Sequence, residues 1–91
     1  MDTREIKSTL VSKLDAEEDR KGHHVYYWMI IDGEEFRVGK LSHSLRGQAP
    51  DFVISDTAKR LKLTKTEFTK LVGCSLGKET HYELWNVRSK K

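Results

Sequence analysis

The chain has 91 residues, of which 34% are charged and 36% hydrophobic, with a formal net charge of +3 at pH 7. This length and composition predict one small folded domain, residues 1–91, with frayed last residues. The longest apolar stretch, residues 25–31, is too short to span a membrane, and a single cysteine leaves no intramolecular disulfide. We therefore expect a cytoplasmic protein without a membrane partner.

The first predicted element is a helix over residues 2–14. Asp2 and Glu5 have the spacing of a capping box, in which each side chain accepts a hydrogen bond from the other residue's backbone. Apolar residues then recur every four positions, as on one face of a helix. They are Ile6, Leu10 and Leu14.

A β-hairpin is predicted next. Residues 15–21 are nearly all charged and end at Gly22, which is typical of an exposed connection. Residues 24–31 are rich in β-branched and aromatic side chains, and apolar and polar residues alternate again over 35–38. The Asp32-Gly33 pair between the two runs is typical of a tight hairpin turn.

A short strand over residues 52–54 is predicted to return to the sheet after the loop that contains the only proline. Ser55 or Asp56 is then expected to cap a short helix that ends at Leu61. These elements predict an α+β fold, a small two-layer domain in which a three-stranded antiparallel sheet packs against helices.

A second capping box, formed by Thr64 and Glu67, predicts a helix over residues 64–72. Gly73 is expected to close this helix in the left-handed conformation. The helices of residues 2–14 and 64–72 are expected to cover one face of the sheet. Residues 78–85 are consistent with a last helical turn or two.

Histidines are the candidate acid–base groups, because imidazole changes charge near neutral pH. His24 begins a predicted strand after His23, and His43 would face the same end of the sheet, whereas His81 is expected on the surface. A metal site formed by His23, His24 and His43 with an acid such as Asp51 is disfavoured. Adjacent residues on a strand, such as His23 and His24, point to opposite faces and do not easily bind one ion.

Cationic residues on the hairpin and the later helices are candidates for phosphate binding beside exposed Tyr26 or Trp28. The predicted nucleic-acid-binding residues are Arg37, Lys40, Arg46, Lys59, Arg60 and Lys62, with Lys65 and Lys70 beside them. A solvated helix surface explains the same charges at least as well. Cys74 is expected to be packed rather than nucleophilic.

The window Gly22-His23-His24-Val25-Tyr26-Tyr27 resembles the signature of the HicA toxins, small proteins with a dsRBD-like fold. That signature is a glycine, a small or polar residue, a histidine, two variable residues and an aromatic. His24 falls on the family's catalytic histidine and Tyr27 on its aromatic, whereas His23 stands where the family usually has serine. Segments 40–43, 54–63 and 68–74 also resemble a group of small prokaryotic proteins related to HicA.

The resemblance implies an RNA-binding domain that cleaves messenger RNA without a metal or other cofactor, with His24 as the acid–base group. It also implies a HicB-like antitoxin as partner. His43 is a candidate second proton-transfer group. Two alternatives stay open. One is a non-catalytic nucleic-acid-binding or protein-interaction module on the same fold, and the other is a helix-turn-helix DNA binder whose recognition helix begins at Lys65.

Overall fold

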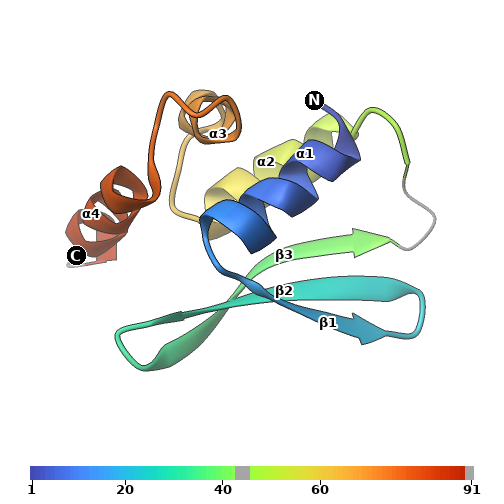
Figure 1. The fold of residues 1–91 in the computed structure, drawn as a ribbon, viewed down its shortest axis with the longest axis horizontal. Coiled ribbons are helices and arrows are strands. Elements are labelled where there is room, and N and C mark those ends of the chain that lie inside the picture. The colour runs from blue at the N-terminus through green and yellow to red at the C-terminus, as the bar shows by residue number, and fades with distance from the viewer. Residues whose placement is uncertain (43–45, 90–91) are drawn as a thin grey trace.

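A three-stranded antiparallel sheet with helices over one face forms the fold in the computed structural model, which describes residues 1–42 and 46–89 (Figure 1). In chain order the elements are α1 (Thr3–Ser8), the π-helical turn η1 (Thr9–Lys13), β1 (Glu17–Lys21), β2 (His24–Ile31), β3 (Glu34–Ser42), α2 (Asp51–Arg60), α3 (Lys65–Val72) and α4 (Lys78–Ser89). The predicted α+β class is confirmed. None of the described helices is long and apolar enough to cross a membrane.

The first predicted helix is confirmed, although its second half is π-helical. The carboxylate of Asp2 accepts a hydrogen bond from the backbone N–H of Arg4 at 2.8 Å, and the Glu5 carboxylate accepts one from the N–H of Asp2 at 3.3 Å. The predicted apolar stripe lies against the sheet and is fully buried. Its members are Ile6, Leu10 and Leu14.

The predicted hairpin is also confirmed. Asp32 and Gly33 have φ angles of 52° and 84°, as the tight turn between β2 and β3 requires. Burial alternates along β2, so one face of this strand belongs to the core and the other is more open. The buried set is Val25, Tyr27, Met29 and Ile31.

The expected connection over residues 15–21 is wrong in its second part, because Glu17–Lys21 forms strand β1 and pairs antiparallel with β2. The segment consists entirely of charged residues, so neither β propensity nor alternating hydrophobicity marks it. It forms a strand because β2 presents a free edge beside it. Charged side chains suit this position, since they protect the edge of a sheet from pairing with other chains.

The expected return strand over residues 52–54 is also wrong, because these residues lie in helix α2. Pro50 precedes the helix with the extended backbone of an N-cap residue, and Ser55 and Asp56 lie in its interior rather than at its start. β-branched residues here face β3 on the buried side of the helix, so tertiary packing outweighs their local preference. The buried set of α2 is Val53, Ile54, Thr57 and Ala58.

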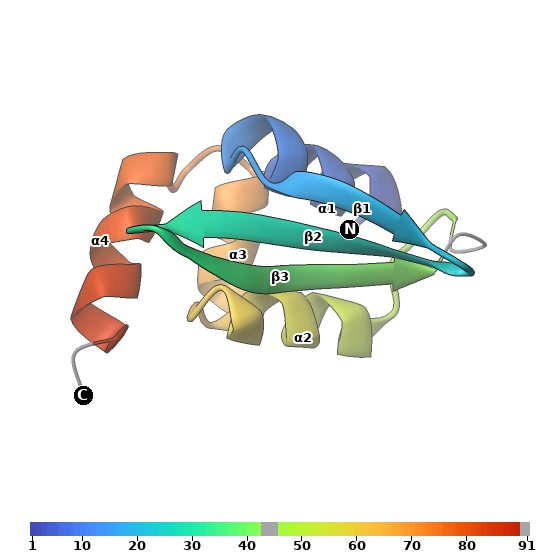
Figure 2. The same cartoon turned by 90° about the horizontal axis from the view of Figure 1, so that it is seen from below.

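Helix α2, and not the helix of residues 64–72, is therefore the second helix over the sheet (Figure 2). Helix α3 packs on α2 and buries Phe68 and Leu71. Its predicted capping box is confirmed, with the backbone N–H of Glu67 donating to the Thr64 hydroxyl at 3.1 Å. Helix α2 thus packs directly on the sheet, and α3 extends the helical layer by packing on α2.

Gly73 does not take the predicted left-handed conformation, since its φ is −81° and the next residue, Cys74, has φ of 68°. We predict that Cys74→Gly stabilises the protein by about 1 kcal/mol, because glycine removes the left-handed strain of a residue with a Cβ. Urea unfolding measures the change. Gly73→Ala is the matched control and should be neutral, because the added methyl meets nothing closer than 3.5 Å. A large loss in Gly73→Ala would contradict this assignment.

A bidentate ion pair joins α3 to α4. The guanidinium of Arg88 donates to both carboxylate oxygens of Glu67, at 2.8 and 2.9 Å. This pair, helped by the cap hydrogen bond from the backbone of Thr64, lowers the pKa of Glu67 to about 2. The carboxylate is charged in the folded protein at pH values where the unfolded chain is already protonated.

The thermal midpoint should therefore fall as the pH drops from the ordinary pKa of 4.5 toward 2, because the stability from a lowered folded-state pKa is fully present above the unfolded-state pKa and is lost on approach to the folded-state pKa. Glu67→Gln should lower the midpoint at pH 7 and make its pH dependence shallower in this range. Differential scanning calorimetry between pH 7 and 2.5 measures both. Glu35→Gln, at an exposed carboxylate of β3, is the control and should keep the wild-type pH dependence.

Candidate functional site

The face of the sheet turned away from α1 and α2, here called the outer face, carries rows of neighbouring side chains from all three strands. The rows are Lys21, His24 and Ser42; Asp19, Tyr26 and Lys40; and Glu17, Trp28 and Arg37. None of the described helices lies over this face (Figure 1). Acidic residues occupy the β1 side of two rows and cations the β3 side, so positive charge concentrates along β2 and β3.

A β-bulge brings two of the predicted cations together. Tyr26 pairs with Lys40 but Trp28 pairs with Arg37, so β3 advances by three residues over a stretch in which β2 advances by two. In a regular strand, residues three apart point to opposite faces, whereas here both Arg37 and Lys40 reach the outer face. Their cationic groups lie 5.6 and 5.9 Å from the centre of the Tyr26 ring. The extra residue, Val38, is fully buried.

His24 begins β2, as predicted, and its half-buried ring lies 6.3 Å from the ring of Tyr26. It opens into a cavity of about 330 Å³ between the end of β3 and the first turns of α2. Lys40 and Asp56 line the same cavity, as does Phe52, whose side chain is 74% exposed. An imidazole, an ammonium and a carboxylate therefore share one opening beside an exposed aromatic ring.

Of the disfavoured metal set, His23 and Asp51 do not line this cavity. His23 is exposed in the turn before β2, and Asp51 forms an ion pair with Lys65. His43 lies outside the described residues. Within residues 1–42 and 46–89, no three His, Cys, Asp or Glu side chains come close enough together to hold a metal ion.

The remaining predicted cations lie elsewhere. Arg46 borders a shallow pocket at the start of α1. Arg60 pairs with Asp56 one turn earlier at 2.9 Å, and Lys59 is exposed beside it. Asp56 lines the His24 cavity, so the guanidinium of Arg60 lies beside that cavity with its charge already paired, whereas Lys59 does not line it.

Lys62 belongs to the contact between α2 and α4. Its ammonium lies 4.5 Å from the centre of the Trp85 ring and donates a hydrogen bond to Ser89. Of the six predicted nucleic-acid-binding residues, only Arg37 and Lys40 therefore accompany His24 on the outer face. The six were chosen by charge alone, and charge does not show which cations already have a partner in the fold.

His81 was expected on the surface, and this is wrong. It is 1% exposed, its Nε2 donates to the carbonyl of Leu61 at 3.1 Å, and its ring lies 6.1 Å from that of Trp85. Burial lowers the pKa of the imidazole. The four-residue spacing of His81 and Trp85 was the available signal that both lie on the inner face of α4.

Cys74 was expected to be packed, and this is also wrong, because its side chain is exposed. The ammonium of Lys13 donates to its sulfur at 2.9 Å and to the carbonyls of Leu71 and Val72, both at 2.8 Å. Lys13 thus closes the end of α3 from the neighbouring turn η1. The contact joins residues 61 positions apart, which no local pattern shows.

No protein-family model, curated protein or solved structure matches this chain.

Proposed function

We propose that this protein binds RNA on the outer face of its sheet. The observation that carries the proposal is the half-buried ring of Tyr26 on the outer face, with Arg37 and Lys40 beside it. An aromatic ring offers a stacking surface to an unpaired base, and neighbouring cations neutralise the phosphates on either side. Acidic residues on β1 repel phosphate, so the RNA backbone runs along β2 and β3 toward the His24 cavity.

Cleavage at this cavity is the second part of the proposal. His24 takes the proton from a ribose 2′-hydroxyl, whose oxygen then attacks the adjacent phosphorus while the bond to the 5′-oxygen breaks. The products are a 2′,3′-cyclic phosphate and a 5′-hydroxyl, so the leaving oxygen must gain a proton. His43 is the candidate donor. The ammonium of Lys40 stabilises the added negative charge on the phosphate in the transition state.

The alternative on the same fold is a module that binds RNA or protein without cleaving. It is favoured by His23, which stands where the resembled family has serine, directly before the proposed catalytic residue. The two readings share the outer face and differ only in whether His24 transfers protons. Within the cytoplasm, a HicB-like antitoxin that covers this face is the partner that the cleaving form requires.

The helix-turn-helix alternative places recognition on α3, and the contacts of that helix favour it less. Its first residue, Lys65, forms an ion pair with Asp51 of α2. Glu67, in the same first turn, carries a negative charge held by Arg88. The end of α3 that would enter the major groove therefore offers DNA less free positive charge than the outer face of the sheet offers RNA.

The test of binding is the salt dependence of affinity for a single-stranded RNA, measured by fluorescence anisotropy between roughly 50 and 200 mM salt. Arg37→Ala combined with Lys40→Ala should weaken binding and reduce the slope of log K against log salt by about 1.4, since each phosphate contact on a single strand contributes about 0.7. Tyr26→Ala should weaken binding without changing the slope.

The matched control removes two cations that lie away from the outer face, through Lys59→Ala combined with Lys70→Ala. Both side chains are exposed, so the net charge falls equally and the fold is preserved. This control should keep most of the affinity. If it weakens RNA binding as much as the Arg37 and Lys40 variant does, the affinity comes from overall charge and the outer face is not the RNA site.

A further inference from the structure

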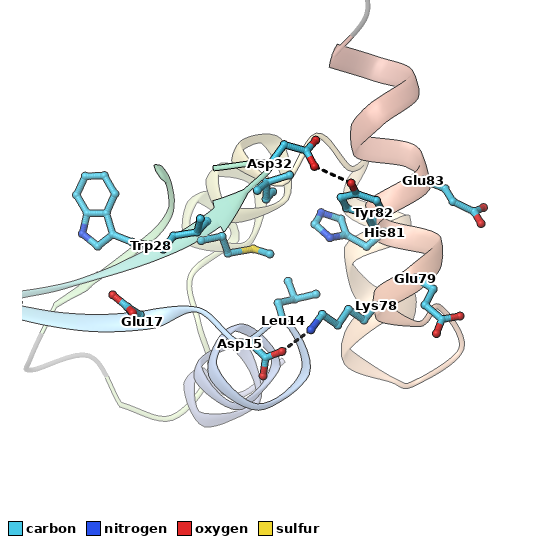
Figure 3. Close-up of a pocket in the computed structure, with 13 residues that line it drawn as sticks. Leu14, Asp15, Glu17, Trp28, Asp32, Lys78, Glu79, His81, Tyr82 and Glu83 are labelled. Carbon is cyan, nitrogen blue, oxygen red and sulfur yellow. Dashed lines mark hydrogen bonds and ion pairs between the residues drawn. The ribbon is translucent and has the colours of Figure 1, made fainter. Parts of the chain in front are cut away.

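A second cavity lies at the other end of the sheet from His24, where β2 passes beneath α4 (Figure 3). It has a volume of about 780 Å³ and lies between the end of η1, the last half of β2 and the first two turns of α4. Its apolar lining comes from Leu14, Trp28, Met29, Ile30 and Ile31. Ile30 is 61% exposed, so part of this apolar surface faces solvent.

One edge of β2 is free along this cavity. The pairing of β1 with β2 begins at Glu17 opposite Trp28, so β1 does not extend along Met29–Ile31. These three residues pair with β3 on their other side only, and no strand of the described chain covers the remaining edge. An unpaired strand edge beside an open groove is a template for an added strand.

The rim of the cavity is acidic on a chain whose net charge is positive. Five carboxylates and one ammonium line it, from Asp15, Glu17, Asp32, Glu79, Glu83 and Lys78. Lys78 pairs with Asp15, whereas Glu17, Glu79 and Glu83 have no ion pair within the described part of the chain. The buried imidazole of His81 stays neutral at pH 7 because burial lowers its pKa, so it does not offset these charges.

The walls are held in place by contacts from both ends of the opening. Lys78 of α4 reaches the bend that follows η1, and the hydroxyl of Tyr82 donates to Asp32 in the hairpin turn at 2.8 Å (Figure 3). The groove therefore exists before any ligand arrives, which lowers the cost of binding. Its carboxylates repel nucleic acid, so its ligand differs from that of the outer face.

We propose that this groove binds an extended basic segment of a partner protein, which adds to the free edge of β2 as a further strand. Alternate side chains of a strand point to opposite sides, so apolar residues of the segment lie on the groove floor while its Lys or Arg residues lie at the acidic rim formed by Glu17, Glu79 and Glu83. Three residues of free edge span about 10 Å, which sets the length of the paired segment.

The test uses a labelled seven-residue peptide, blocked at both ends, in which Arg alternates with Val. Fluorescence anisotropy at low salt should show binding that weakens about tenfold in a Glu79→Gln, Glu83→Gln double variant, because both carboxylates belong to the acidic rim and attract the peptide at low salt. The matched control is Glu34→Gln with Glu35→Gln, which removes two exposed carboxylates of β3 that do not line the cavity. It should bind the peptide as the wild type does.

A second measurement separates strand addition from simple charge attraction. The same peptide with alternate backbone amides methylated keeps its charge but cannot pair with β2, and it should lose most of its affinity. Hydrogen exchange should show added protection over residues 29–31 with the unmethylated peptide only. Tyr26→Ala should leave peptide binding unchanged, which separates this result from RNA binding.

Three results would overturn the proposal. Equal weakening by the two double variants would mean that net charge alone attracts the peptide. Full affinity of the methylated peptide would exclude strand addition. A dimer of the free protein that forms with rising concentration in sedimentation, and is lost in the Glu79, Glu83 variant, would show that a second copy occupies the groove.

Discussion

Replacing His24 with alanine is expected to lower RNA cleavage by about 10²–10⁴-fold, the contribution of one general acid–base group, while the protein stays folded. The imidazole is half-buried at the beginning of β2, outside the hydrophobic core, so its removal changes little packing. In the proposed binding mode, in which Tyr26 and Lys40 make the RNA contacts, the loss is confined to the transition state. Cleavage of a labelled RNA, affinity and thermal midpoint should be measured on one preparation.

The matched control is His23→Ala, since this neighbouring histidine is exposed in the turn and does not line the cavity. It should cleave at the wild-type rate, and EDTA should leave that rate unchanged. Wild-type protein that binds RNA without cleaving it would favour the non-catalytic module. A His24→Ala variant that cleaves normally would show that His24 is not the acid–base group, and His43→Ala would then be tested.

Tyr27→Ala is expected to cost about 3–5 kcal/mol of folding free energy, a large part of the 5–15 kcal/mol typical of a whole domain. The side chain is 1% exposed at the centre of the sheet, on the face under α1. The backbone of β3 packs tightly against Leu10 and Tyr27 at Gly39. A Cβ added to this glycine would lie 2.9 Å from Leu10 and 3.4 Å from the Tyr27 ring. A cavity at this position cannot be refilled by small shifts. The variant's urea midpoint should be far lower, or the chain unfolded.

The hydroxyl of Tyr27 contributes much less than its ring. It donates to Glu18 at 3.0 Å, and burial together with this carboxylate raises the pKa of the phenol. Tyr27→Phe should cost only about 1 kcal/mol, since Glu18 keeps its contacts with Lys7 and Arg20. If Tyr27→Phe binds RNA with wild-type affinity, Tyr27 acts in the core and not in RNA binding. A loss below 1 kcal/mol in Tyr27→Ala would contradict the packing argument.

Signals between neighbouring residues predicted the fold most accurately. Both capping boxes and the Asp32-Gly33 turn depend on residues within a few positions of one another, and all three are confirmed. Strand β1 and the first part of helix α2 were missed because their own side chains do not mark them as strand and helix. β1 is a strand through pairing with β2, and α2 is a helix whose β-branched residues pack on β3.

The candidate site was predicted as a set of residue types and only in part as an arrangement. His24 was expected at the start of a strand and is found there. Arg37 and Lys40 were both named as cations, but ordinary alternation along a strand places them on opposite faces, and only the bulge brings them to one ring. The acidic groove was not predicted, because its walls join β2 to a helix almost fifty residues later.

The bulge in β3 also determines which changes of length this strand can absorb. Loss of Val38 alone would leave a regular strand, because Arg37 would still pair with Trp28 and Phe36 with Met29. Phe36 would then keep its ring beside Trp85, from which it now lies 4.9 Å away. One residue gained or lost elsewhere in the strand would turn part of it over and separate the cation cluster from the seat of α4. Changes of length in this strand should therefore be confined to the bulge and the hairpin turn.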